Sequence, residues 1–325
     1  MIQPVEMKKV SPMTLHGGAR STTSEVWEML SATRAGDLDR VTQLILKRPE
    51  LTTCQYNYTP PLHFAVREGH LALVKTLIAH DAYDSNYKSY PFGDTLLTMA
   101  EDRGYDDIAA SLKTANGRRW VETGKIDYEQ DEEQKRFDKA VHEENYPSVE
   151  GLLKSRPDLA QNELSSWAEG VLMMPSRGNN RVLVELLLSY GARVPAISKW
   201  GRFYYFKHDV IAAFLLDNGM SAAHATWHHV TLLHDMAQAG DIPKAKLLLD
   251  RGAEINAVDE EYRSAPIGPA ARWGRRDMVA FLLARGADPN KAGATWSTPL
   301  AWAHKKGHTD IEKDLTTAGA TFENP

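Results

Sequence analysis

Cysteine is almost missing from this sequence, which has one, Cys54, among 325 residues. A single thiol cannot form a disulfide within the chain, and it cannot supply the several thiolates of a cysteine-based zinc site. A disulfide-stabilised secreted scaffold is therefore excluded, and a reducing compartment is permitted.

Long hydrophobic runs are also missing. No stretch reaches the roughly 18 apolar residues of a membrane-spanning helix, so we expect no membrane insertion. The N-terminus carries Lys8 and Lys9 without the apolar core of a Sec signal peptide, and its Gly, Ser and Thr content predicts a flexible tail over residues 1–24. We expect a cytoplasmic protein, or one secreted without a Sec signal if it acts as an effector.

An excess of positive charge is lacking too, because 38 Lys and Arg residues face 43 Asp and Glu residues, for a net charge of −5. Proteins that bind nucleic-acid phosphates usually show a clustered basic excess, so the composition argues against a nucleic-acid partner. The G-x-S-x-G, P-loop, H-E-x-x-H and G-x-G-x-x-G signatures are absent as well. The sequence therefore favours a binding protein over an enzyme, assigns no catalytic residue and predicts no cofactor.

What the sequence does contain is an internal repeat. The letters RGA at Arg251–Ala253 recur at Arg285–Ala287, 34 residues later, and AGA follows at Ala318–Ala320. A set of glycines marks nearly the same period near the N-terminus: Gly36, Gly69 and Gly104. A fixed period of this length is typical of a solenoid built from repeated helical units.

One copy of the repeat shows how each unit folds. Pro61 suits the first turn of a helix, where its missing N–H removes no hydrogen bond, and Gly69 suits a left-handed turn at the end of that helix. Val74, Leu77 and Ile78 then form the apolar stripe of a second helix. Neither helix can bury its stripe alone, so neighbouring copies must stack.

Three copies carry a recognisable text: PLHFAVREGH from Pro61, TLLHDMAQAGD from Thr231 and TPLAWAHKKGH from Thr298. They resemble the ankyrin repeat, whose pattern is T-P-L-H-x-A followed by G-H, V-x-x-L-L and G-A. The resemblance implies an all-α solenoid of about nine helix-turn-helix repeats joined by β-hairpin loops. It also implies a structural role for the histidines of the TPLH position, His63 and His234.

The period is interrupted once, because Gly104 and Glu144 are 40 residues apart. The sequence thus predicts repeats one to three over residues 25–118, an acidic insertion over 119–133 and repeats four to nine over 134–325. We interpret the insertion as a solvated loop; a hinge between two sub-arrays and a docking loop are the alternatives.

Three histidines, His224, His228 and His229, lie in the segment HATWHH between repeats six and seven. Imidazoles at this spacing can share a metal ion, but no carboxylate or cysteine completes a ligand set nearby in the sequence. We therefore predict no metal site, and we interpret the segment as a polar, aromatic-rich contact tip.

Ankyrin arrays usually contact partners through hairpin tips and through the ends of the first helices. The register places twelve residues in these positions: Tyr56, Arg67, Arg103, His142, Glu143, Tyr205, Phe206, Trp227, His228, Tyr262, Arg272 and Trp273. Folding demands none of them, and aromatic residues and arginine are enriched at interfaces. We expect the binding face to centre on repeats six to eight.

Two functions follow from this interpretation. The first is a scaffold or adaptor that recognises another protein or peptide on the concave face of the array. The alternative is a ligand-binding or catalytic solenoid with a pocket in the diverged repeats four to six, where His142 with Glu143, or Tyr204 and Tyr205 with His208, would provide acid and base groups. A shallow groove favours a peptide, and a closed polar pocket favours a small ligand.

Overall fold

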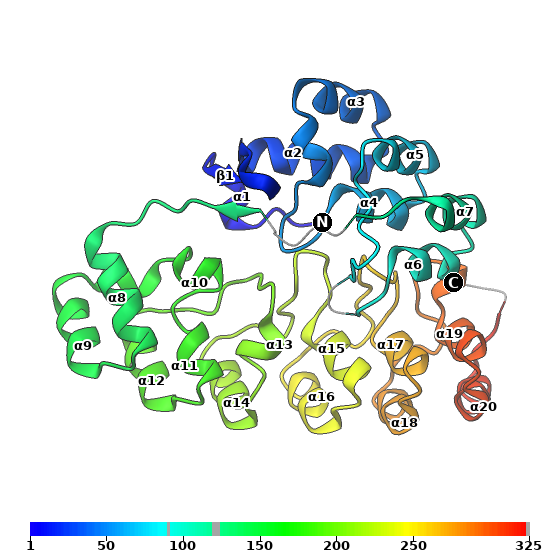
Figure 1. The fold of residues 1–325 in the computed structure, drawn as a ribbon. Coiled ribbons are helices and arrows are strands. Elements are labelled where there is room, and N and C mark those ends of the chain that lie inside the picture. Colours follow the sequence, from blue (N-terminus) through cyan, green and yellow to red (C-terminus); the bar gives the residue numbers. More distant parts are fainter. Residues whose placement is uncertain (90–91, 119–123, 323–325) are drawn as a thin grey trace. The chain divides into compact units, whose positions relative to one another are not determined.

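The computed structural model describes residues 1–89, 92–118 and 124–322. Most of these residues form helices that follow one another in antiparallel pairs (Figure 1). The chain divides into two compact units, Glu6–Glu129 and Gln130–Pro325, and Met1–Val5 belongs to the second of them. We number the helix pairs as repeats one to nine in chain order.

The unit Glu6–Glu129 holds repeats one to three. Their helices are α2 (Thr23–Ala35) with α3 (Leu38–Lys47), α4 (Pro61–Glu68) with α5 (Leu71–Ala79), and α6 (Leu96–Asp102) with α7 (Asp106–Thr114). The first helices α2, α4 and α6 contact one another in order, and so do the second helices α3, α5 and α7. The stacking of helix pairs that the apolar stripes predict is therefore present.

The N-terminal residues form regular structure instead of the predicted loose tail. They contain α1 (Val5–Lys8), the strands β1 (Pro12–Thr14) and β2 (Arg20–Thr22), and a 3₁₀ turn, η1 (His16–Gly18), between the strands. Met7, Met13 and Leu15 are buried, so apolar side chains hold this segment on its unit, which composition alone did not indicate.

Part of the predicted insertion over 119–133 completes the same small sheet. The strand β3 (Lys125–Ile126) pairs with β1, where Met13 lies opposite Ile126, and the strand order is β2-β1-β3 with antiparallel pairing. Residues 119–123 of the insertion lie outside the described residues. The last residues of the insertion already belong to the next helix, because Asp131 caps it by accepting a hydrogen bond from the backbone of Gln134.

The second unit holds repeats four to nine. Their helices are α8 (Glu132–His142) with α9 (Tyr146–Ser155), α11 (Met173–Arg177) with α12 (Arg181–Ser189), α13 (Gly201–Tyr204) with α14 (Asp209–Asp217), α15 (Leu232–Ala239) with α16 (Ile242–Leu249), α17 (Ile267–Arg272) with α18 (Arg276–Ala284), and α19 (Pro299–Lys306) with α20 (Thr309–Thr317). A short turn, α10 (Ser165–Ala168), precedes α11. The first helices form one continuous row, since each contacts the first helix of the next repeat from α8 to α19.

The best-formed repeats show why the sequence pattern gives this fold. In repeat seven, the hydroxyl of Thr231 accepts from the backbone of His234 while the His234 ring accepts from the backbone of Thr231, which closes a capping box. The Nε2 of His234 donates to the carbonyl of Ser264 in the next hairpin, at 3.0 Å. At the turn of repeat two, Gly69 has a φ of 82°, and a Cβ there would lie 2.9 Å from the ring of Tyr105.

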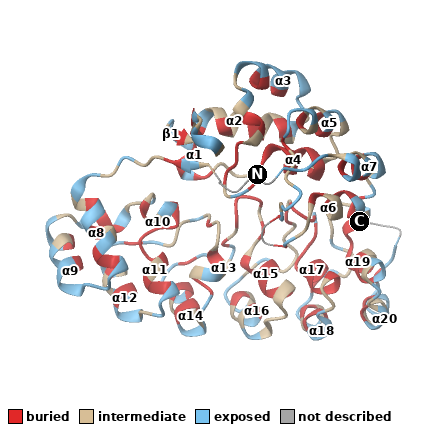
Figure 2. Ribbon diagram, in the orientation of Figure 1, coloured by how far each residue is buried: buried red, intermediate tan, exposed pale blue. Residues whose placement is uncertain are grey.

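Buried residues gather where helices face their neighbours, and the outward sides of α16, α18 and α20 are exposed (Figure 2). The part of the chain that the structure describes thus contains nine helix pairs, and the predicted all-α solenoid is confirmed.

Candidate partner-binding face

The structure exposes His142 and Glu143 and half-buries Trp273, but it buries the other nine side chains predicted to face solvent. Those nine are Tyr56, Arg67, Arg103, Tyr205, Phe206, Trp227, His228, Tyr262 and Arg272. Each of them was assigned by register alone, and register does not fix the direction of a long or aromatic side chain.

Tyr205 and Phe206 were expected at the exposed end of a first helix. Helix α13 is a single turn that ends at Tyr204, so both rings turn into the core of the unit. The Tyr205 hydroxyl donates to the carbonyl of Glu169, and its ring meets the edge of His224 at 6.1 Å. Burial raises the pKa of the Tyr205 hydroxyl well above its ordinary value, so this buried group stays neutral.

The hairpin residues Trp227 and His228 also pack inward. Their rings are 4.0 Å apart, and the Trp227 carbonyl accepts a hydrogen bond from the backbone N–H of Ile2 at 2.9 Å. The Nδ1 of His228 lies 3.2 Å from a carboxylate oxygen of Glu261. These contacts use the groups that were expected to meet a partner.

Arg272 is enclosed by aromatic rings. Its guanidinium carbon lies 4.6 Å from the ring centre of Tyr262, 4.2 Å from that of Trp273 and 5.0 Å from that of Trp302. Tyr262 in turn meets the edges of both tryptophans. A cation–π interaction is stronger when the cation is shielded from water, as Arg272 is here. The cluster therefore stabilises the packing of repeat eight against repeat nine.

The predicted residues of the unit Glu6–Glu129 form hydrogen bonds within that unit. Arg67 donates to the carboxylate of Glu68 at 2.7 Å, and Arg103 donates to the carbonyl of Met99 at 3.1 Å. The hydroxyl of Tyr56 donates to a carboxylate oxygen of Glu6 at 2.6 Å. Long polar side chains can satisfy their donors locally in this way while their stems cover apolar surface.

The three histidines of HATWHH contact different groups. His224 is buried, which lowers the pKa of its imidazole to about 4 and keeps the ring neutral. His228 contacts Glu261, as described above, and His229 Nδ1 lies 2.9 Å from an oxygen of Glu260. Both carboxylates come from the next hairpin, one repeat further along the chain. They are too far from the histidines in the sequence to be recognised as partners.

Two exposed aromatic side chains of repeats five and six were missed by the sequence reasoning. Trp167 is 67% exposed and Phe203 is 47% exposed, and the Trp200 ring lies 6.2 Å from that of Phe203. The Nζ of Lys199 donates to the carbonyl of Trp167, which joins the tip of repeat five to the loop before α13. We call Trp167, Lys199, Trp200, Arg202 and Phe203 the aromatic patch. The signals that pointed to this region were the decay of the repeat pattern and the gathering of aromatic residues in repeats four to six.

The backbone around Trp167 is unusual. Ser166, Trp167 and Ala168 have φ values of 53°, 60° and 61°, whereas the tips of repeats seven and eight have a single such residue, His229 and Arg263. Each left-handed residue other than glycine costs roughly 1 kcal/mol, and a bulky residue there is an outlier. The fold therefore maintains a strained turn that presents a tryptophan to solvent.

A buried polar network holds the loop of the patch in place. The Glu169 carboxylate accepts from the Ser198 hydroxyl at 2.6 Å and from the backbone N–H of Lys199 at 2.8 Å. At the start of α13, a Cβ on Gly201 would lie 2.9 Å from His224 Nε2, so only glycine fits this approach. Buried contacts therefore support the loop that carries the patch.

A buried carboxyl group lies in the helix that follows the patch. Asp235 of α15 is 3% exposed, and burial raises its pKa to about 7, which the positive charge of Arg202 partly opposes. A carboxyl group in such a setting is protonated near neutral pH more often than a surface aspartate.

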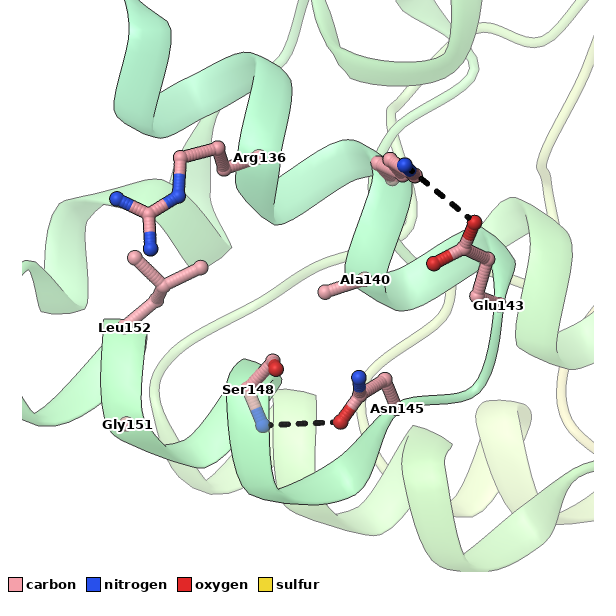
Figure 3. Close-up of a pocket in the computed structure, with 8 residues that line it drawn as sticks. Arg136, Ala140, Glu143, Asn145, Ser148, Gly151 and Leu152 are labelled. Carbon is pink, nitrogen blue, oxygen red and sulfur yellow. Dashed lines mark hydrogen bonds and ion pairs between the residues drawn. The ribbon is translucent and has the colours of Figure 1, made fainter.

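The alternative prediction was a closed ligand pocket in repeats four to six. The structure has an open groove of about 520 Å³ between α8 and α9 (Figure 3). Arg136, Glu143, Asn145 and Ser148 line it, and Lys139 lies 3.8 Å from Glu143 across one side. Repeat four is the first repeat of its unit, and Asn145 has the register position at which His70 of repeat two bonds to the preceding repeat. The groove is therefore the polar end face of a six-repeat stack, and Tyr204 and Tyr205 are not among its lining residues.

None of the helices in the described part of the chain is both long and apolar enough to cross a membrane. The chain resembles several curated proteins over short stretches. It is 36% identical to mouse 2-5A-dependent ribonuclease over 63 residues, which is 19% of this chain and 9% of the ribonuclease. It is 31% identical over 110 residues to the ankyrin repeat, SAM and basic leucine zipper domain-containing protein 1 of Dasypus novemcinctus, 33% of this chain and 23% of that protein.

A third relative is the human ARF GTPase-activating protein GIT1, 29% identical over 83 residues, or 26% of this chain and 11% of GIT1. The chain thus spans less than a quarter of each of these relatives. The family model for ankyrin repeats in three copies matches residues 29–119 and 233–323, which together are more than half of the sequence. With nine helix pairs, left-handed turn glycines and a capped TPLH-type histidine in the structure, the chain belongs to the ankyrin-repeat family.

Proposed function

We propose that this protein is a binding module, a scaffold or adaptor, that recognises another protein through the aromatic patch of repeats five and six. Ankyrin repeats typically bind proteins, which supports the class of function. The observation that carries the proposal is Trp167, which is 67% exposed and occupies a turn with three left-handed residues in a row.

Folding gains little from a tryptophan at this position. The side chain leaves most of its surface in water, and the backbone pays a conformational cost that glycine would avoid. Strained backbone is typical of functional segments, and tryptophan is enriched among the residues that dominate binding energy. The binding role of Trp167 accounts for both features.

The patch lies at the positions through which ankyrin arrays usually contact partners, the hairpin tips and the first helices. Trp167 belongs to a hairpin tip and Phe203 to a first helix, and the first helices α11 and α13 are in contact. His142, Glu143 and Trp273 keep some exposure and remain candidates for the edge of this face. The proposed centre therefore moves from repeats six to eight toward repeats five and six. A cytoplasmic location is part of the proposal, and it fits the single buried Cys54.

The test compares Trp167→Gly and Phe203→Ala with the wild type. Glycine removes the ring and relaxes the left-handed backbone, so Trp167→Gly should unfold at an equal or slightly higher urea concentration. Quantitative affinity capture from the native host should show the partners of the wild type lost from both variants.

The matched control is Val210→Ala, which changes an exposed apolar residue on the second helix α14. This variant should capture the same partners as the wild type. Unchanged capture by Trp167→Gly and Phe203→Ala together would refute the proposal. Loss of capture on changing Arg136 and Lys139 instead would assign binding to the groove of repeat four.

A further inference from the structure

A cavity of about 310 Å³ lies between repeats five and six, at the C-terminal ends of their second helices α12 and α14. The residues that line it are Leu188, Arg193, Val194, Leu215, Asn218, Gly219 and Met220. Leu215 and Met220 are buried. Leu188 and Val194 are half-buried, so these four side chains give the cavity an apolar wall. Small-molecule sites in proteins begin at roughly this volume, about 300 Å³.

The next two repeat junctions carry an ion pair at the corresponding position. Between repeats six and seven, Nη2 of Arg251 lies 2.8 Å from a carboxylate oxygen of Asp217. Between repeats seven and eight, Nη2 of Arg285 lies 2.7 Å from a carboxylate oxygen of Asp250. In both pairs the arginine directly precedes the glycine that ends its helix pair, and the aspartate stands at the end of the preceding second helix. Each pair therefore spans the gap between two neighbouring second helices.

The junction of repeats five and six has different residues at these two positions. Asn218 replaces the arginine and Ser189 replaces the aspartate, so the two cannot form an ion pair. The amide of Asn218 donates to the carbonyl of Phe214 on its own helix at 2.8 Å. The hydroxyl of Ser189 donates to the carbonyl of Leu186 at 2.7 Å. Neither side chain reaches across the gap to the other, and the cavity opens at this position.

The charge at the edge of the cavity is reversed as well. Arg193 lines the cavity, whereas the same register position holds Glu254 in repeat seven and Asp288 in repeat eight. The Arg193 side chain is exposed, and no carboxylate in the described part of the chain forms an ion pair with it. The residues that line the cavity include no acid. A guanidinium group without a counter-ion therefore stands beside an apolar wall.

The helix ends next to the cavity do not cancel this charge. Free carbonyl groups at the end of a helix carry partial negative charge and would oppose an anion. The Leu188 carbonyl accepts from the backbone N–H of Gly191 at 2.9 Å, and the Leu215 carbonyl accepts from that of Met220 at 2.9 Å. Because these carbonyls are occupied, Arg193 sets the sign of the charge that the cavity offers to a ligand.

We infer that this cavity binds a small aliphatic carboxylate, with its chain against Leu188, Leu215 and Met220 and its carboxylate on Arg193. A guanidinium binds a carboxylate through two parallel charge-assisted hydrogen bonds. Each methylene group of the ligand that leaves water adds to the affinity, and the flexible thioether of Met220 adapts to the shape of the chain. The inference goes beyond the proposed function, because the aromatic patch contributes no residue to the cavity.

The test is isothermal titration calorimetry of the full chain with octanoate. Octylammonium has the same chain with the opposite charge, and butyrate has the same carboxylate on a shorter chain. We expect octanoate to bind at least about tenfold more tightly than either of them. A peptide with a free C-terminal leucine offers the same chemistry from a protein source.

Two variants test the assigned residues. Arg193→Ala should lower the affinity for octanoate at least about tenfold, because it removes the charge-assisted bonds. The double variant Ser189→Asp with Asn218→Arg introduces the ion pair of the next two junctions and should abolish octanoate binding. Its urea midpoint should change little, since exposed ion pairs contribute little to stability. The matched control is Arg136→Ala, which removes the same charge from the groove of repeat four and should bind octanoate like the wild type.

Equal octanoate binding by the wild type and Arg193→Ala, or by the wild type and the double variant, would overturn the inference. Tighter binding of octylammonium would overturn it in favour of a cationic ligand. Tighter binding of the leucine peptide would overturn it in favour of the C-terminus of a partner protein. Trp167→Gly should bind octanoate like the wild type even though it loses the native partners, so this experiment and the test of the proposed function can fail separately.

Discussion

Repeats seven to nine and repeats five and six are built from the same helix pairs but differ in which aromatic rings they leave exposed. In repeats eight and nine, Tyr262 and Trp302 are buried around Arg272. In repeats five and six, Trp167 and Phe203 are exposed aromatic residues. The two regions therefore show which aromatic residues the fold buries and which it leaves exposed.

The first helices of the two regions also differ in length. Helices α15 and α19 have eight residues each and present two turns of apolar side chains to their neighbours, whereas α11 has five and α13 has four. A single turn cannot direct residues three and four apart onto one face. Residues at its start stay outside, and Tyr205 and Phe206 beyond its end turn inward.

The largest effect that would test this comparison is the loss of a buried ring. Trp302→Ala removes a fully buried side chain and should lower the free energy of unfolding by about 3–5 kcal/mol. Trp167→Ala removes the same residue type from the surface and should change it by less than about 0.5 kcal/mol. Urea titrations of both variants measure the difference, and similar losses would remove the distinction between the two regions.

The next effect concerns the cap of repeat seven. His234→Ala breaks the capping box with Thr231 and removes one of two donors to the buried Ser264 carbonyl, the other being the backbone N–H of Asp259, which together should cost about 2 kcal/mol. The comparison is His208→Ala in repeat six, where Nε2 donates to the Arg177 carbonyl at a half-exposed position. This variant should lose less than about 1 kcal/mol. A larger loss for His208→Ala would mean that repeat six depends on its turn more than repeat seven does.

A smaller and pH-dependent effect is expected at Asp235, in the first helix of repeat seven. Its pKa is raised to about 7 by burial, so the folded state binds a proton more tightly than the unfolded chain does. This contribution is fully present below the unfolded pKa of about 4 and is lost as the pH rises toward 7. Asp235→Asn should therefore be more stable than the wild type by about 1–2 kcal/mol at pH 8.

The gain from Asp235→Asn should shrink toward pH 4, and the control is the difference between the two unfolding curves at each pH. Asp259, whose pKa burial raises to about 6, is present in both proteins and does not enter that difference. A gain that is constant with pH would show that the Asp235 carboxyl is not the titrating group.

The smallest effect belongs to the exposed ion pairs between second helices. Asp250 accepts from Lys246 and Arg285, whose bonds lower the pKa of its carboxyl. The pairs are solvated, so Asp250→Asn should change the urea midpoint less than any variant above, and added salt should abolish the change. A loss that survives high salt would show that these pairs support the stack more than their exposure indicates.

Much of the fold followed from the sequence because the repeat fixes local geometry. Gly69 predicted the left-handed turn that the structure shows, and Pro61 and Pro299 stand in the first turns of their helices. The structural role assigned to His234 is confirmed by its bonds. These features depend on a few neighbouring residues, so the period alone identifies them.

The direction of the side chains did not follow. Tyr205 and Trp227 were expected outside and are buried, because the register gives a position along the chain but not the length of a helix or the depth of a hairpin. Trp167 was missed because repeat five departs from the pattern that located every other candidate. The aromatic patch is thus found where sequence comparison is weakest.

The strand β3 has a consequence for how the first unit is made. Stacked helix pairs form from contacts between neighbours in the chain, and such contacts are fast to assemble and can form while synthesis continues. The pairing of Met13 with Ile126 joins residues at the two ends of that unit. It cannot form until all three helix pairs have been synthesised, so it is a contact that a nascent chain ending before Ile126 would lack.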